Sequence, residues 1–150
     1  MDAISILKAD HKKVEGLFKR LLKLGDTAHT ARKKLFVEID AEISVHAHIE
    51  EKIFYPALKA KTGPNTDERD EVLEAYEEHA LVKGMLHELE ALNPKNETYN
   101  AKLQVLSELV KHHVKEEEGE MFPQAKKLLS AEELKSLGGK LEAAKAKALA

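Results

Sequence analysis

A repeated pattern of histidine and glutamate constrains the fold of this 150-residue chain more than any other feature. Residues 46–56 read His-Ala-His-Ile-Glu-Glu-Lys-Ile-Phe-Tyr-Pro, and residues 113–123 read His-Val-Lys-Glu-Glu-Glu-Gly-Glu-Met-Phe-Pro. In each segment a glutamate follows the first histidine by four positions and a proline follows it by ten. Since residues four apart share one face of a helix, each segment presents an imidazole beside a carboxylate. Such a pair suits a first-row transition metal.

Two further histidines extend the repeat towards the N-terminus. His11 precedes His46 by 35 residues, and His79 precedes His113 by 34. Corresponding residues of the two copies are therefore 67 or 68 positions apart. An internal period of this length predicts two copies of a helix pair. Each copy supplies one histidine and one His-x-x-x-Glu pair.

Six residues of the repeat lie on helix faces that are otherwise apolar, and we predict them to be the metal ligands: His11, His46, Glu50, His79, His113 and Glu117. The remaining histidines lie in expected loops or on other faces: His29, His48, His87 and His112. Burying an unpaired carboxylate costs about several kcal/mol, and no lysine or arginine lies on the same faces. A metal ion resolves this cost, because it holds carboxylates ionised and imidazoles neutral.

Other polar and aromatic residues near the six are interpreted as neighbours of the site rather than ligands. They are the pair His112 and Glu116, the two acids Glu51 and Glu118, and the tyrosines Tyr55 and Tyr76. His112 and Glu116 have the same spacing, but their face is rotated by about 100° from the apolar one. The two acids are expected to be solvated or to support the ligands from behind. The two tyrosines are expected to be packing residues, although Tyr76 lies one turn from His79 and can reach the site.

Apolar spacing predicts an all-α fold with long helices and short polar connections. The expected helices cover about residues 3–24, residues 31–56, the stretch between the loops at 61–66 and 93–96, and the stretch from there to about residue 128. The short connections favour an up-down-up-down four-helix bundle. Pro56 and Pro123 are each expected to kink or end their helix.

A short extra helix is expected at the C-terminus. Ser130-Ala-Glu-Glu133 has the pattern of a capping box, which opens a helix. Gly138 and Gly139 are expected to interrupt this helix, and Leu141–Ala150 is expected to be a fraying surface helix. The predicted organisation is thus a metal-binding domain at residues 1–130 and a helical tail at 131–150.

Composition narrows the function classes. Lys and Arg total 24 against 27 Asp and Glu, and this balance gives a net charge of −3 with no basic footprint for nucleic acid. The absence of cysteine excludes disulfides, thiolate metal sites and iron–sulfur clusters. No basic and apolar leader opens the chain, and no apolar run reaches the roughly 18 residues of a membrane span. We therefore expect a cytoplasmic protein that binds neither membrane nor nucleic acid.

The motifs together resemble the hemerythrin-like, HHE cation-binding family over about residues 3–129. They are Asp10-His11, His46-x-x-x-Glu50 followed by Phe-Tyr-Pro, Glu78-His79, and His113-x-x-x-Glu117 followed by Phe-Pro. The resemblance implies two iron ions inside the bundle, with an oxo or hydroxo bridge, although zinc or manganese can replace iron. It also implies that the four histidines bind terminally and that the two glutamates bridge the metals.

Two departures separate this chain from the oxygen-carrying hemerythrins. Those proteins have a second histidine one turn along the third helix, where this chain has Ala75 and Lys83. Their last acidic ligand is an aspartate one residue later than Glu117. The resemblance therefore implies a protein that binds, senses or scavenges O2, peroxide or NO rather than a simple carrier. Two alternatives stay open: an enzyme that decomposes peroxide or reduces NO, and a metal-storage or structural bundle.

Overall fold

The computed structural model describes residues 1–149, and most of these residues are helical. The elements are α1 (Ala3–Leu22), α2 (His29–Ile49), the π-helical η1 (Glu50–Phe54), α3 (Tyr55–Lys59), α4 (Asp67–Ala91), α5 (Tyr99–Glu116), the π-helical η2 (Glu117–Met121), α6 (Phe122–Leu128) and α7 (Ala131–Leu149). Residues 1–149 contain no strand, so the all-α prediction is confirmed. Among these helices, none combines the length and the apolar composition that crossing a lipid bilayer requires.

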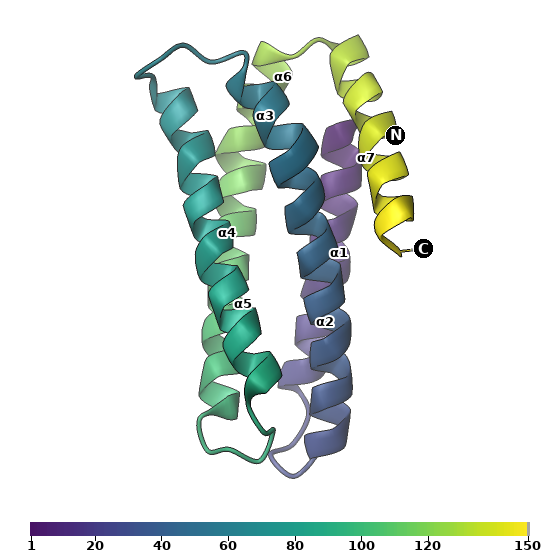
Figure 1. Ribbon diagram of the computed structural model, residues 1–150, viewed down its shortest axis with the longest axis vertical. Helices are drawn as coiled ribbons and strands as arrows, with labels where there is room; N and C mark the ends of the chain where they lie inside the picture. The colour runs from purple at the N-terminus through teal and green to yellow at the C-terminus, as the bar shows by residue number, and fades with distance from the viewer. Residues whose placement is uncertain (150) are drawn as a thin grey trace.

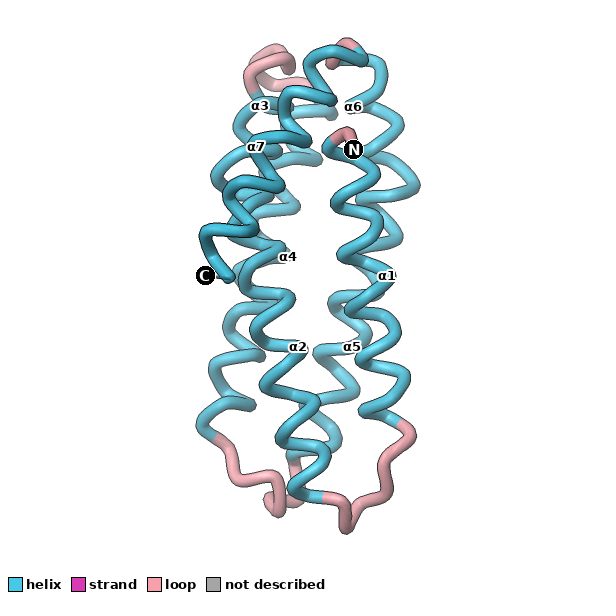
Figure 2. The backbone as a smooth tube through the Cα atoms, turned by 90° about the vertical axis from the view of Figure 1, so that its right-hand side faces the viewer, coloured by secondary structure: helices cyan, strands magenta, loops and turns pink. Residues whose placement is uncertain are grey.

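The helices lie side by side along one long axis (Figure 1). The connections α1–α2 and α4–α5 lie at one end of the molecule, and α3–α4 and α6–α7 lie at the other. The tube drawing shows the same grouping of loops at the two ends (Figure 2). From the last connection α7 runs back along α1 and α2, which it contacts. Consecutive long helices therefore run in opposite directions.

Each of the two prolines follows a widened helical turn. The backbone N–H of Tyr55 donates to the carbonyl of Glu50, and that of Phe122 donates to the carbonyl of Glu117. These bonds span five residues instead of four, which defines a π-helical turn. Because the turn widens before the proline, the helix continues through Pro56 and ends at Lys59, three residues beyond the proline. Both widened turns begin at a predicted glutamate ligand.

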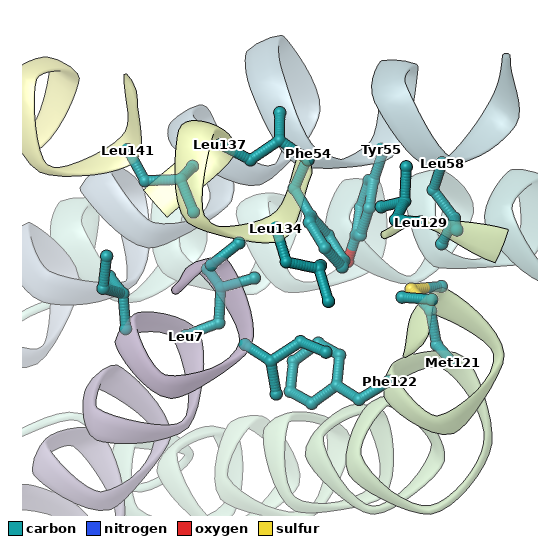
Figure 3. Packing of buried hydrophobic residues seen from close by; sticks show 14 of the residues in the cluster. Leu7, Phe54, Tyr55, Leu58, Met121, Phe122, Leu129, Leu134, Leu137 and Leu141 are labelled. Atoms are coloured by element: carbon teal, nitrogen blue, oxygen red, sulfur yellow. The ribbon is translucent and has the colours of Figure 1, made fainter. Parts of the chain in front are cut away.

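Two apolar clusters fill the molecule, one towards each end. The cluster near α3 and α6 includes Phe54, Phe122 and the start of α1, and Figure 3 shows leucines of α7 facing these side chains. The other cluster is centred on Phe36, Leu86 and residues near them on α1 and α5. Along each helix the predicted metal ligands lie between residues of the two clusters, so buried apolar side chains lie on both sides of them.

The C-terminal helix differs from its prediction. Ser130 and Glu133 form the expected capping box, with backbone-to-side-chain bonds of 3.0 and 3.1 Å. However, α7 continues through Gly138 and Gly139 to Leu149, and Leu141 is fully buried. The predicted interruption at Gly138 and Gly139 is therefore wrong. The segment after Leu141 is helical, as predicted, and most of its residues are exposed, while Ala150 lies outside the described residues. The leucines before and after the glycines share one buried face, and its burial holds the helix together.

Gly138 has a specific role in this packing. A Cβ atom at this position would lie 2.2 Å from the carbonyl oxygen of Met1 and 2.9 Å from the backbone of Asp2. Only glycine allows α7 to approach the start of α1 this closely. A Cβ at Gly139 would meet no atom within 4 Å. The glycine pair therefore marks a helix contact rather than a helix break.

Candidate metal centre

The structure brings the six predicted ligands together in two groups. One group contains His11 and His46, the other contains His79 and His113, and both groups share Glu50 and Glu117. Within each group, one ligand atom from every residue lies within 4.8 Å of the others. We call the His11–His46 group the first position and the His79–His113 group the second position. The assignment of the six residues as metal ligands stays a prediction, but their geometry allows it.

The two shared carboxylates lie between the four imidazoles. His11 Nε2 is 3.0 Å from Glu117, and His46 Nε2 is 3.1 Å from Glu50. On the other side, His79 Nε2 is 3.1 Å from Glu50 and His113 Nε2 is 3.2 Å from Glu117. Glu50 and Glu117 are almost completely buried. Each carboxylate therefore contacts one imidazole of each position, as a bridging ligand must.

Every one of the four imidazoles is held from behind by a second carboxylate. In each case the Nδ1 atom donates a hydrogen bond to the carboxylate. The pairs are His11 with Glu118 (2.6 Å), His46 with Asp10 (2.9 Å), His79 with Glu51 (2.9 Å) and His113 with Glu78 (2.7 Å). A carboxylate at Nδ1 fixes the ring orientation and leaves Nε2 free to bind a metal. This pattern orients all four Nε2 atoms towards the shared glutamates.

Sequence reasoning found only part of this outer layer. Glu51 and Glu118 were expected to be solvated or to support the ligands, and they do the latter. The roles of Asp10 and Glu78 were missed. One signal was available, because each of these four acids directly adjoins a predicted ligand in sequence. A residue next to a core position lies about 100° around the helix and so faces a neighbouring helix.

Two imidazoles of the site have pKa values raised by the carboxylates around them. Burial lowers the pKa of His46, but the charge of Glu50 and the hydrogen bond to Asp10 outweigh it and raise the pKa to about 10. Burial also lowers the pKa of His113, but hydrogen bonds to Glu117, Glu50 and Glu78 outweigh it and raise the pKa to about 12. Burial raises the pKa of Glu50, but His46 and the other imidazoles hold it well below its usual range. Metal entry must therefore displace protons from the imidazoles.

Four buried atoms of the first position make no well-aligned hydrogen bond, although His11 Nε2 lies 3.0 Å from Glu117 Oε1 and His46 Nε2 lies 3.1 Å from Glu50: His11 Nε2, His46 Nε2, Glu50 Oε2 and Glu117 Oε1. Unpaired buried polar atoms are costly and call for an explanation. One cation among them would satisfy all four, because imidazole nitrogen and carboxylate oxygen are its usual donors. The residues of the first position therefore fit a metal ion.

The second position contains an additional donor, the hydroxyl of Tyr55. It donates to Glu117 at 2.5 Å and lies 3.1 Å from Glu50. It also lies 3.2 Å from His79 Nε2 and 3.3 Å from His113 Nε2. Burial and the neighbouring charges of Glu50 and Glu117 raise the tyrosine pKa well above its usual value, so the metal-free site holds a neutral phenol. Tyr55 is buried as predicted, but packing is only part of its role.

The π-helical turn explains why Tyr55 was missed. On a regular α-helix, the side chain five positions after Glu50 would point to a different side of the helix. In a π-helical turn, whose hydrogen bonds span five residues, the side chains of Glu50 and Tyr55 lie on nearly the same side. The repeat places Phe122 at the corresponding position of the second copy, where its ring stacks on His11 at 5.8 Å. The other tyrosine, Tyr76, donates to the backbone carbonyl of Glu51 at 3.3 Å and stays behind the site.

Residues that were set aside as flanking lie outside the centre. His112 has a side chain that is 65 % exposed, and it pairs with Glu116 at 2.9 Å. His48 is exposed on α2. His113 points into the bundle and His112 points outwards, in the register that the 67-residue period predicts.

A small apolar cavity adjoins the centre. All four imidazoles line it, together with aliphatic side chains that include Val14, Ile43 and Leu86. Its volume is about 40 Å³, and one water molecule needs roughly 10–15 Å³. The cavity therefore has room for a small molecule beside the four imidazoles, in mostly apolar surroundings.

The fold and the site define a helical metal-binding protein with a histidine and glutamate centre. The chain belongs to the hemerythrin HHE cation-binding domain family, whose sequence profile matches residues 2–125. The family predicted from the motifs is therefore confirmed.

Two uncharacterized proteins, from Mycobacterium tuberculosis and Mycobacterium bovis, are each 28 % identical over 146 residues, which cover 95 % of this chain and 84 % of theirs. A DNA nickase from Nostoc sp. is 26 % identical over 98 % of this chain, which spans only 40 % of the length of that relative. The crystal structure of a hemerythrin HHE cation-binding domain-containing protein from Mycobacterium kansasii superposes with a TM-score of 0.84. It is 26 % identical, over 99 % of this chain and 87 % of that one.

Proposed function

We propose that the chain is a non-haem di-iron protein that binds or reacts with O2, peroxide or NO. One iron would be held by His11 and His46, the other by His79 and His113, with Glu50, Glu117 and an oxo or hydroxo group as bridges. The observation that carries the proposal is that two buried ligand groups share two carboxylates. Membership of a cation-binding family supports it.

The surroundings of the site support small and weakly polar ligands. Iron would supply the redox chemistry and the open coordination that these side chains lack. The protein residues hold and orient: the outer carboxylates fix the imidazole rings, and the aliphatic lining of the cavity keeps bulk water away. The cavity of about 40 Å³ matches a diatomic molecule or peroxide better than a larger substrate.

Tyr55 is the candidate for a seventh protein ligand, at the second position. Its hydroxyl oxygen lies within 3.3 Å of both imidazole Nε2 atoms of that position and of both shared glutamates. A phenol at this point fills coordination space that the oxygen carriers give to a histidine. The first position has Phe122 instead, which supplies no ligand atom, and the adjoining cavity is also lined by His11 and His46. We therefore propose that small ligands bind at the first position.

Metal analysis combined with an optical spectrum tests the centre. We expect two irons per chain, near-ultraviolet bands of an oxo bridge, and a visible charge-transfer band from phenolate to ferric iron. Tyr55→Phe should keep both irons and lose the visible band, whereas the control Tyr76→Phe should keep the band. Zinc or manganese as the tightly bound metal, or one iron per chain, would contradict the di-iron proposal. A visible band that survives in Tyr55→Phe would contradict the tyrosine ligand alone.

Rapid mixing separates the possible activities. We expect the reduced protein to react quickly with O2 without a long-lived reversible adduct, and the oxidised protein to change its spectrum with azide. Repeated consumption of peroxide or NO would favour the enzyme alternative, and iron that is inert to all of these would favour storage. The Nostoc relative carries the name DNA nickase, but this chain spans only 40 % of its length. A net charge of −3 gives no reason to propose it here.

A further inference from the structure

A lysine of the C-terminal helix reaches the outer layer of the metal centre. The amine of Lys145 on α7 forms an ion pair with Asp10 Oδ1, while Asp10 Oδ2 accepts from Nδ1 of His46 at 2.9 Å. The carboxylate of Asp10 is 5 % exposed. One buried carboxylate thus joins Lys145 to an imidazole of the first position, and this chain of contacts crosses from α7 through α1 to α2.

The second position has a corresponding lysine, but it comes from within the repeat. Lys83 on α4 pairs with Glu51 at 2.6 Å, and Glu51 holds His79. Counting back by the period of 67 or 68 residues from Lys83 leads to Gly16 or Glu15, neither of which is a cation. The repeat therefore gives the second position a lysine and gives the first position none. At the first position α7 supplies a positive charge, and it does so at Asp10, whereas the repeat counterpart of Glu51 is Glu118.

The way α7 docks makes Lys145 part of a fixed contact. Leu134, Leu137 and Leu141 are buried against the cluster that contains Phe54 and Phe122 (Figure 3). The spacing of these leucines continues to position 145, which is one turn beyond Leu141. Lys145 therefore extends from the docking face of α7, and its side chain is only 29 % exposed.

We propose that Lys145 is a positioning residue for the metal at the first position, and that α7 is thereby a working part of the metal centre. Lys145 fixes the rotamer of Asp10, which fixes the ring of His46. Its charge also limits how strongly Asp10 attracts the Nδ1 proton of His46. A stronger attraction of this proton makes the imidazole a better electron donor to the metal, and this favours ferric over ferrous iron. This inference depends on the proposed di-iron function.

Redox titration of the full-length, iron-loaded protein tests the charge of Lys145. Lys145→Met keeps the length of the side chain and removes its charge, and the exposed Lys140→Met is the matched control. We expect Lys145→Met to shift the ferric–ferrous equilibrium of one iron at least tenfold towards ferric, which is about 59 mV for one electron. Lys145→Arg and Lys140→Met should keep the wild-type potentials. Unchanged potentials in Lys145→Met would overturn the inference.

A pair of glycine variants tests the docking of α7 while Lys145 stays in place. Gly138→Ala places a Cβ against the backbone of Met1 and Asp2, so α7 must move, whereas Gly139→Ala meets no atom within 4 Å. We expect Gly138→Ala to reproduce the shift of Lys145→Met and Gly139→Ala to leave the potentials unchanged. A shift in Gly138→Ala without one in Lys145→Met would overturn the role of the lysine.

The two levels of the proposal fail separately. If the wild-type protein binds no iron, the proposed function fails. If it binds two irons and Lys145→Met leaves both potentials unchanged, only the role of Lys145 fails. Should Gly138→Ala not fold, Lys145→Met still decides, because that substitution preserves the apolar face that docks α7.

Discussion

The two metal positions descend from the same repeat, yet they differ in what fills them. Both have two imidazoles and share two carboxylates. At the second position the hydroxyl of Tyr55 makes hydrogen bonds to the polar atoms, whereas at the first position four buried polar atoms make no well-aligned hydrogen bond and Phe122 lies nearby. One hydroxyl oxygen, present in one copy of the repeat and absent from the other, therefore distinguishes the two ligand groups. A repeat can copy ligands while a single substitution divides their roles.

The same asymmetry continues outside the ligands. Glu51 at the second position is supported by Lys83, whose side chain is 51 % exposed. Asp10 at the first position is supported by Lys145, which comes from outside the repeat and is more buried. The first position, which lacks a tyrosine, thus has the more buried of the two lysines in its outer layer.

The largest expected effect comes from removing what the two positions share. Glu50→Ala or Glu117→Ala should lose at least one of the two metals, because each carboxylate contacts an imidazole of both positions. Elemental analysis of the purified variants measures the loss. His48→Ala and His112→Ala, which change exposed side chains, should keep both metals. Metal loss in His112→Ala together with retention in His113→Ala would show that the register of α5 is wrong.

The pH dependence should have opposite signs with and without metal. In the metal-free protein, His46 and His113 have pKa values raised to about 10 and about 12. The stability that they contribute is complete below their unfolded pKa of about 6.5 and is lost as the pH rises through the folded values. The pKa of Glu50 is lowered, so its contribution is present above about pH 4.5 and is lost on acidification.

We therefore expect the melting temperature of the metal-free protein to fall as the pH rises from about 6 to about 9. Metal binding must remove protons from the imidazoles, so its affinity rises over the same range. The difference in melting temperature between the metal-loaded and the metal-free protein should therefore widen as the pH rises, by the equivalent of several kcal/mol in the free energy of unfolding. Scanning calorimetry of both forms at several pH values measures it. A difference that narrows with rising pH would contradict the protonated metal-free site.

Substitutions in the outer carboxylates should separate the two positions. Asp10→Asn and Glu78→Gln change corresponding residues of the repeat, and losing such a contact typically costs about 10- to 100-fold in metal affinity. Asp10 is 5 % exposed and Glu78 is 24 % exposed. Water can replace Glu78 more easily, so we expect Asp10→Asn near the upper end and Glu78→Gln near the lower. Competition with a chelator measures both, and a larger loss in Glu78→Gln would reverse the proposed difference between the positions.

The smallest expected effect belongs to the exposed lysine of the second position. Lys83→Met removes an ion pair whose lysine is half exposed to water, and such pairs contribute about 0.2–1 kcal/mol. We expect metal affinity at the second position to fall by about twofold to fivefold. The same chelator competition measures it, with Lys140→Met as the control. A loss as large as that of Asp10→Asn would show that solvent does not screen Lys83.

The sequence alone determined the family, the all-α class and the six residues that the structure brings together. Their spacing carries this information, because residues three and four apart share a helix face and a polar residue on an apolar face is recognisable without coordinates. The period of 67 residues also selected His113 over His112. The capping box at Ser130 was readable for the same reason, since its contacts span three residues.

Contacts between helices were decided only by the tertiary structure. The histidine partners of the outer acids lie up to 107 residues away, as for His11 and Glu118, and no spacing within one helix encodes them. Tyr55 entered the centre because its helix widens into a π-helical turn, which a period of 3.6 residues does not anticipate. Gly138 and Lys145 acquired their roles from the approach of α7 to α1. Helical periodicity specifies which face is buried, whereas packing specifies what that face meets.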